Sequence, residues 1–302
     1  MRTLWQATRP YSFPAAAVPV AVGTAVAPLV HPGLAVHWGQ AALVLAGATA
    51  AQAVSNLVND LVDARRGIDH AGNAGRGNPI VAGTLGPGAM LGLAVAIGAA
   101  GLVIAAWLTG VAGPPVAWLA AAGALLAVFY TAPPVALKYR ALGDVAVFTA
   151  FGVLILMGAY FVQAHATVDP LGGRALRALA AYGLPGALLV VAILYANNHR
   201  DRDTDRGTGA RTVANLLSAT TSRRVLVALL VAPYAWLLAA ALAGATTRWV
   251  LLALLAAPAG LPVARAIRAD HYDGDLVPRI AGLHGLTGLL TVLGMAIAGG
   301  AR

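Results

Sequence analysis

YGLPGALLVVAILYANNHRDRDTDRGTGART, residues 182–212, joins an apolar run to a strongly charged segment. Residues 182–196 carry no charged side chain, whereas residues 200–211 contain three aspartates and four arginines. An uncharged apolar run is typical of a helix that crosses a bilayer, and ionisable side chains avoid the hydrocarbon core. The stretch therefore predicts a membrane span followed by a polar segment whose charges need a separate explanation.

The composition of the whole chain places it among membrane proteins. Of its 302 residues 59% are hydrophobic and 10% are charged, and the mean hydropathy is +0.77. The N-terminal apolar run is too long for a signal peptide and lacks a clear cleavage site, so we interpret it as the first span. The chain has no cysteine, which excludes disulfides and thiolate metal sites.

The net charge of +9 would suggest a nucleic-acid partner in a soluble protein. In a membrane protein, an excess of arginine in the cytoplasmic loops explains it, so we expect a lipid bilayer as partner and no nucleic acid.

Apolar runs of roughly 18–25 residues, long enough to cross a bilayer, recur along the chain. We expect an all-α, polytopic bundle of nine transmembrane helices. The expected spans are 13–31, 40–62, 88–109, 114–132, 142–164, 178–196, 223–244, 247–267 and 278–299. With the N-terminus inside, most basic residues fall on the cytoplasmic side, which predicts a multi-pass protein of the inner (cytoplasmic) membrane with cytoplasmic charged loops.

The second expected span ends in SNLVNDLVDARRGIDH, residues 55–70. Four of its polar residues have the spacing i, i+3, i+4, i+7 and so share one helical face: Asn56, Asn59, Asp60 and Asp63. Gly67 is a plausible helix end, which leaves Asp69 just beyond it. This is the first aspartate cluster.

The second aspartate cluster follows the sixth expected span. Asn197, Asn198, Asp201 and Asp205 share a face, with Asp201 and Asp205 one helical turn apart. Both clusters enter loops on the same side of the membrane, so a bundle can bring them face to face.

Closely spaced carboxylates repel one another, and a divalent cation removes that penalty. Aspartate and asparagine oxygens suit Mg²⁺, which usually completes its coordination with substrate phosphates. We therefore expect Asp60, Asp63, Asp201 and Asp205 to hold Mg²⁺ that binds a diphosphate, with arginines on the remaining oxygens. Asp203, Arg202 and Arg206 point off the shared face and are better explained as solvated loop charges.

These motifs resemble those of the UbiA superfamily of intramembrane prenyltransferases, and within it the 1,4-dihydroxy-2-naphthoate polyprenyltransferases of menaquinone biosynthesis (MenA-type). The likeness covers nearly the whole chain. NLVNDLVDARRGID is similar to the family's N-x-x-N-D-x-x-D-x-x-x-G-x-D motif, and NNHRDRDTDRGTGART to its N-N-x-R-D-x-x-T-D-x-x-x-G-K-R-T motif. ATRPYSFPAAAVPVAVGTA, PIVAGTL and YTAPPVALKYRALGDVAVFTAFG resemble further family segments.

The resemblance implies one prenyltransferase domain over residues 1–302, with a central cavity under cytoplasmic loops. It implies Mg²⁺-dependent transfer from a polyprenyl diphosphate to an aromatic acceptor. The implied catalytic residues are Asp60, Asp63, Asp201, Asp205, Arg200 and Lys138. The implied substrate-binding residues are Asn56, Asn59, Asn198, Asp69, Arg76, Tyr139, Arg140 and Arg211.

The sequence departs from the family pattern at three positions. Ala210 replaces the lysine before Arg-Thr, and Asp144 replaces a glutamate. Asn78 stands where a basic residue precedes PIVAG, and Arg76 lies two residues earlier. The first and third changes thin the basic lining, so we expect Arg76 and Arg211 to compensate or the diphosphate to be held differently.

The most specific function that the resemblance implies is prenylation of 1,4-dihydroxy-2-naphthoate. Within the superfamily, the alternatives are transfer to 4-hydroxybenzoate or homogentisate, or a terpene cyclase. An ion-coupled transporter is the alternative of another class, but it would place ionisable residues near span midpoints, where this chain has almost none.

Overall fold

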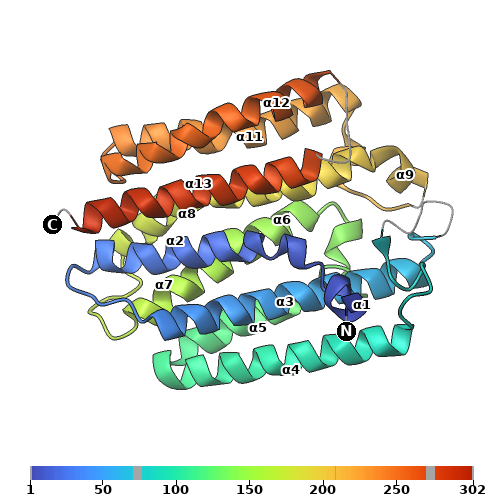
Figure 1. Ribbon diagram of the computed structural model, residues 1–302, viewed down its shortest axis with the longest axis horizontal. Coiled ribbons are helices and arrows are strands. Elements are labelled where there is room, and N and C mark those ends of the chain that lie inside the picture. Colours follow the sequence, from blue (N-terminus) through green and yellow to red (C-terminus); the bar gives the residue numbers. More distant parts are fainter. Residues whose placement is uncertain (1, 71–76, 208, 270–275, 301–302) are drawn as a thin grey trace.

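The computed structural model describes residues 2–70, 77–207, 209–269 and 276–300, and helices dominate it (Figure 1). The long helices run side by side as a bundle. Its main segments are α2 (Pro14–Val30), α3 (Trp38–Arg65), α4 (Pro87–Ala112), α5 (Pro114–Phe129), the continuous α6 (Gly143–Val147), η4 (Phe148–Ile155) and α7 (Leu156–Ala164), α8 (Gly173–Arg200), α11 (Ala219–Leu242), η5 (Arg248–Ala256) with α12 (Ala257–Arg268), and α13 (Leu276–Gly300).

This arrangement confirms the predicted all-α membrane bundle. Within the described residues, eight of the helical segments are long and apolar enough to cross a bilayer, and α5 is a shorter apolar helix. Each expected span coincides with one segment. Gly113, with φ of +91°, makes the turn between α4 and α5, where a residue with a Cβ atom would be strained.

Two of the helices continue past the C-terminal ends of their predicted spans and into the polar clusters. α3 continues to Arg65 rather than ending at 62, and α8 continues to Arg200 rather than ending at 196. Asp60, Asp63, Asn197 and Asn198 are therefore helical residues and are held by a rigid backbone. The predicted ends of these two helices come earlier because the run of apolar residues stops where the polar side chains begin, although the helix itself continues.

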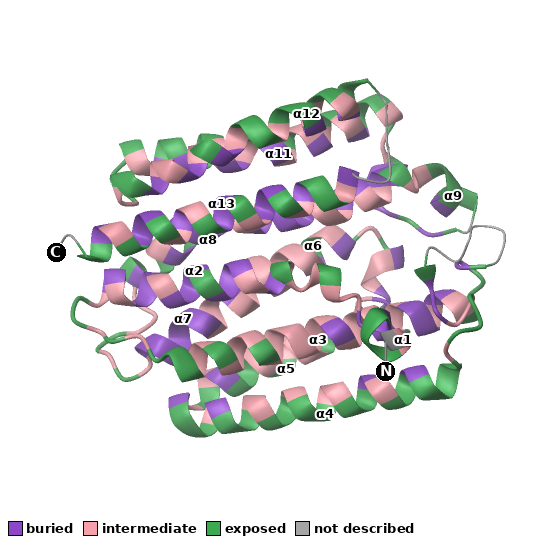
Figure 2. Cartoon of the chain, in the orientation of Figure 1, coloured by how far each residue is buried: buried purple, intermediate pink, exposed green. Residues whose placement is uncertain are grey.

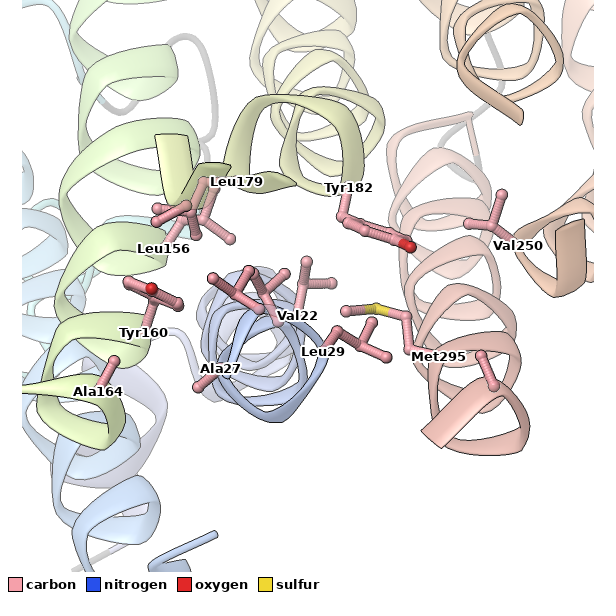
Figure 3. Close-up of a cluster of buried hydrophobic side chains, with 14 of the residues drawn as sticks. Val22, Ala27, Leu29, Leu156, Tyr160, Ala164, Leu179, Tyr182, Val250 and Met295 are labelled. Atoms are coloured by element: carbon pink, nitrogen blue, oxygen red, sulfur yellow. The ribbon is translucent and has the colours of Figure 1, made fainter. Parts of the chain in front are cut away.

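The interior of the bundle is packed around α2, which contacts α7, α8 and α13. Val22, Leu156, Tyr160, Leu179 and Met295 belong to one buried cluster, shown in Figure 3. Glycines allow this close packing. A Cβ atom on Gly23 would collide with the Leu156 carbonyl oxygen, and one on Gly294 with the Trp249 carbonyl oxygen.

The peripheral helices have exposed outward faces, as Figure 2 shows for α4, and these faces carry large apolar side chains. Leu91, Val95, Leu102 and Val103 of α4 all face outward. Large exposed apolar surfaces are rare on soluble monomers and mark contact with lipid or partners. With the eight apolar helices, this surface makes the chain a multi-pass membrane protein.

Candidate functional site

Asp63 is the most completely held carboxylate of the first cluster. It is buried near the end of α3, and Lys138 Nζ lies 2.7 Å from its Oδ2. The Tyr139 hydroxyl donates a hydrogen bond to Oδ1. Both partners come from the short helix η3 (Leu137–Tyr139). Burial, and then the charge of Asp63, raise the pKa of Tyr139 above its usual value, so its hydroxyl remains a donor.

Asp60, one helical turn earlier, pairs with a residue far away in the sequence. Arg9, in the segment before α2, donates to Asp60 Oδ1 and forms an ion pair with it. The other carboxylate oxygen, Oδ2, is buried and has no hydrogen-bond partner among the described residues. An orphaned buried carboxylate oxygen is costly, and a bound cation or a donor from a ligand would satisfy it.

Asparagines connect the first cluster to its surroundings. Asn59 Oδ1 accepts from Lys138 Nζ at 2.8 Å, while the Asn56 amide donates to the Thr8 carbonyl oxygen at 3.0 Å. Asn59 therefore attaches the loop that contains η3, called the η3 loop below, to α3. Asn56 attaches the N-terminal segment to the same helix. Asn56 has a structural contact here rather than one with an open site.

Asn78 explains one departure from the family pattern. It is fully buried and donates to the Asp60 carbonyl oxygen at 2.8 Å and to Asp69 Oδ2 at 3.0 Å. A basic side chain would not reproduce this pair of hydrogen bonds, which one side-chain amide donates. Asn78 therefore fixes the loop after α3, and Asp69, which is itself buried, is its partner.

The second cluster is paired locally. Arg200 donates to both carboxylate oxygens of Asp201, at 3.0 and 2.9 Å, and to Asn197 Oδ1 at 2.6 Å. Helix α8 ends here, and α9 (Arg202–Gly207) begins after Asp201. The Asp205 N–H still donates to the Asp201 carbonyl oxygen at 2.9 Å, which keeps the two aspartates one turn apart. Asp205 is buried, whereas Asn198 is only half-buried.

The η3 loop joins the two motifs. Arg140 and Arg211 form an isolated parallel β-bridge, in which the Ala141 N–H donates to the Arg211 carbonyl oxygen at 2.7 Å. Ala210 packs in a small apolar cluster with Ile68, Ala136 and Tyr139. The same Tyr139 that holds Asp63 therefore also contacts the second motif, and a lysine at 210 would have to leave this contact.

Several predicted residues are less central than the sequence suggested. The side chains of Arg140 and Arg211 are exposed, and Arg140 donates to the Pro134 carbonyl oxygen. Arg76 and the acidic HYDGD segment, residues 271–275, lie outside the described residues. His199 is a buried residue of α8, with Nδ1 2.6 Å from Ser222 Oγ. Asp203 is 83% exposed, as a solvated charge would be.

Sequence reasoning missed Arg9 and the role of Asn78. Arg9 lies about 50 residues before its partner, and Asn78 was interpreted as a loss of positive charge rather than as a buried amide. The only available signal was that both are polar residues next to apolar segments.

The donor chemistry of the two clusters fits a hard divalent cation such as Mg²⁺. All the candidate ligands are carboxylate or amide oxygens, and Asp60 Oδ2 is an unused buried oxygen. Among the described residues, no group of three or more aspartates or histidines converges on one point. The clusters therefore resemble two incomplete sets of ligands, which phosphate oxygens of a substrate would complete.

Known proteins resemble this chain over most of its length. The model of the UbiA prenyltransferase family matches residues 16–299. UbiA prenyltransferase domain-containing protein 1 of Homo sapiens is 35% identical over 97% of this chain and 82% of its own length. The 1,4-dihydroxy-2-naphthoate octaprenyltransferase of Bacillus subtilis (strain 168) is 27% identical over 77% of this chain and 71% of its own length.

Solved structures share the fold. A UbiA homolog from Archaeoglobus fulgidus bound to GPP and Mg²⁺ superposes with a TM-score of 0.63 at 17% identity, covering 96% of this chain and 99% of that one. The family model and the vertebrate relative each extend over most of the sequence. The chain therefore belongs to the UbiA prenyltransferase family and is a multi-pass membrane prenyltransferase.

Proposed function

We propose that the protein transfers a polyprenyl group from a polyprenyl diphosphate to an aromatic acceptor, with Mg²⁺ as cofactor. The observation that carries the proposal is the η3 loop, where Lys138 and Tyr139 hold Asp63 while the adjoining backbone bonds to Arg211 of the second motif. Two acidic motifs and the chain's single lysine thus belong to one connected site. The whole chain, residues 1–302, serves as one domain in this proposal.

The roles of the residues follow from their contacts. Asp60, Asp63, Asp201 and Asp205 would hold Mg²⁺, which when bound neutralises the charge of the diphosphate. Arg200 and Lys138 are the cations beside these carboxylates and would contact the oxygens of the leaving group. Asn59, Asn198 and Tyr139 would position the ligand oxygens, with Asn56, Asp69 and Asn78 supporting the loop around them.

The reaction needs a leaving diphosphate and a protected carbocation. The bond between the allylic C1 and the diphosphate oxygen breaks, and its electron pair departs with the oxygen. Fixed positive charge from Arg200 and Lys138 favours that departure because charge develops there in the transition state. The apolar helices exclude water, which would otherwise capture the cation. The acceptor ring then donates an electron pair and forms the new carbon–carbon bond.

The most specific acceptor in this proposal is 1,4-dihydroxy-2-naphthoate. Attack through its carboxylated carbon is completed when the carboxylate leaves as CO₂ and its electron pair restores the aromatic ring. The naphthoate octaprenyltransferase of Bacillus subtilis supports this choice. The greater identity to the vertebrate proteins makes a comparison of acceptors part of the test.

The location follows from charge. We propose the inner (cytoplasmic) membrane, with the N-terminus and both motifs on the cytoplasmic side, because arginine is concentrated at that end of the bundle. Protease accessibility of a tag placed at residue 1 in sealed vesicles tests this orientation.

The test of function is a prenylation assay with purified protein in lipid nanodiscs. Labelled polyprenyl diphosphate is supplied with 1,4-dihydroxy-2-naphthoate, 4-hydroxybenzoate, homogentisate or no acceptor, each with Mg²⁺ or EDTA. We expect a prenylated naphthol product and CO₂ only with the naphthoate and Mg²⁺. Transfer only to 4-hydroxybenzoate or homogentisate would show that this compound, and not the naphthoate, is the acceptor. A cyclised hydrocarbon formed without any acceptor would overturn the transferase proposal.

A further inference from the structure

A cleft lies between α11 and α12, two helices that carry neither motif. It has a volume of about 310 Å³ and is lined by Thr220, Arg223, Arg224, Val227 and Arg268. Pockets of about 300 Å³ and more are large enough for small ligands. Three of the five lining residues are arginines, so the cleft suits an anion.

Two of the three arginines of this cleft, Arg224 and Arg268, have no acidic partner in the described part of the chain. Arg224 and Arg268 are exposed and form no ion pair within residues 2–70, 77–207, 209–269 and 276–300. Arg265, one turn before Arg268 on α12, is exposed too and likewise forms no ion pair there. Like charges around one cleft repel, and a bound anion relieves that repulsion while accepting forked guanidinium hydrogen bonds.

The surroundings of the cleft indicate which kind of anion it takes. Helices α11 and α12 lie together at the outer edge of the bundle (Figure 1). Seven residues, or two turns, from Arg224 on the same face is Val231, which is 55% exposed. Leu261 lies seven residues before Arg268 on the same face of α12 and is 54% exposed. Each arginine thus lies about 10 Å along its helix from an outward apolar side chain.

This pairing of a cationic cleft with apolar helix faces matches the two parts of a phospholipid. Basic pockets between transmembrane helices at the cytoplasmic surface are suited to acidic headgroups. The cleft is near the end of the bundle that carries the second motif, because α11 follows that motif directly in the chain. The inner side of α11 there also contacts α8, through Ser222 and His199.

We propose that the cleft between α11 and α12 binds the phosphate headgroup of an anionic glycerophospholipid, with the acyl chains lying along the exposed apolar faces of both helices. Arg224 and Arg268 provide the charge, Thr220 a hydroxyl donor, and Val227 the start of the apolar surface. The site is independent of the acceptor and of the prenyl diphosphate.

The test compares lipid binding to the full-length protein by native mass spectrometry and by thermal unfolding in detergent. The probes are phosphatidylglycerol, phosphatidylcholine, inorganic phosphate and pyrophosphate. We expect one retained phosphatidylglycerol and a raised unfolding temperature, with little effect of phosphatidylcholine. Any effect of phosphate or pyrophosphate should be the same in wild type and in the cleft variant, because it comes from the aspartate clusters. The variant Arg224→Gln/Arg268→Gln should bind roughly 30-fold more weakly, since each arginine contributes roughly fivefold at an anionic lipid surface.

The matched control is Arg174→Gln/Arg177→Gln, which removes two exposed arginines from the first turn of α8, at the opposite end of the bundle. It should retain wild-type lipid binding. An equal loss of lipid binding in both variants would show that binding depends on net charge and not on the cleft. Undiminished lipid binding in the Arg224→Gln/Arg268→Gln variant would overturn the proposed site. Stabilisation by inorganic phosphate or pyrophosphate that is lost in the Arg224→Gln/Arg268→Gln variant would show that the cleft takes a free anion rather than a lipid.

Discussion

The two aspartate clusters solve the same electrostatic problem in different ways. Asp60 and Asp63 are buried and are neutralised by partners 51 and 75 residues away, Arg9 and Lys138. Asp201 is neutralised by its neighbour Arg200, at the exposed junction of two helices. Long-range partners fix a side chain through the tertiary fold, whereas a neighbouring partner can move with it. We therefore expect the first cluster to be rigid and Asp201 of the second cluster to adjust more readily.

Asp63→Ala should have the largest effect because it damages both the chemistry and the fold. It removes a candidate metal ligand and leaves Lys138 and Tyr139 without their shared acceptor. We expect prenyl transfer to fall by on the order of 100-fold or more and the free energy of unfolding by about 2 kcal/mol. Activity and thermal inactivation measure the two effects. Asp203→Ala, at an exposed position, is the control and should change neither.

Asp201→Ala tests whether the second cluster contributes less to stability than the first. We expect a comparable loss of activity, on the order of 100-fold, with expression and thermal inactivation close to wild type. The reason is that Arg200 is partly exposed and keeps its hydrogen bond to Asn197. If this variant lost as much stability as Asp63→Ala, the contrast between a rigid and an adjustable cluster would be wrong.

Arg9→Gln tests the long-range neutralisation of Asp60. Without the guanidinium, Asp60 is a buried carboxylate with neither oxygen paired to a cation. We expect a loss of about 1–3 kcal/mol of stability in EDTA, most of which millimolar Mg²⁺ restores. Arg65→Gln, at an exposed position on the same helix as Asp60, is the control. An Arg9→Gln protein that is insensitive to Mg²⁺ would argue against Asp60 as a ligand.

Tyr139→Phe should have a smaller effect, since Lys138 still neutralises Asp63. We expect activity to fall by about 10-fold, as for one lost hydrogen bond to a charged group. The raised pKa of Tyr139 favours its protonated form in the folded protein. Its contribution to stability is therefore fully present below about pH 10 and declines above that value. Unfolding measured from pH 7 to 10.5 should show a steeper decline above about pH 10 in wild type than in Tyr139→Phe.

Ala210→Lys, which restores the residue of the family motif, should have the smallest effect. The long side chain cannot remain within the cluster of Ile68, Ala136 and Tyr139, but its stem can extend toward solvent. We expect a loss of about 1 kcal/mol in stability and an unchanged KM for the prenyl diphosphate. A KM lowered by tenfold or more would instead show that position 210 contacts the diphosphate.

Much of the fold could be predicted from the sequence because apolar length alone defines a membrane span. The same pattern could not give the ends of α3 and α8, since both helices continue through polar residues. The shared face of Asp60 and Asp63 was predictable from helical spacing. The partners of these residues were not, because ion pairs such as Arg9–Asp60 depend on packing between distant segments. Asn78 and Ala210 were interpreted as missing charges, although burial gives each a structural contact instead.

Lys138 gives the site an experimental advantage. It is the only lysine among the 302 residues, so reagents that modify primary amines have two targets, this side chain and the N-terminus. Reductive methylation with ¹³C would place a single side-chain NMR reporter on Lys138 Nζ, the atom that lies 2.7 Å from Asp63 Oδ2 in the native protein. The chemical shift of that one methyl signal could then follow the arrival of metal, diphosphate and acceptor in a protein otherwise too crowded with alanine and leucine to resolve.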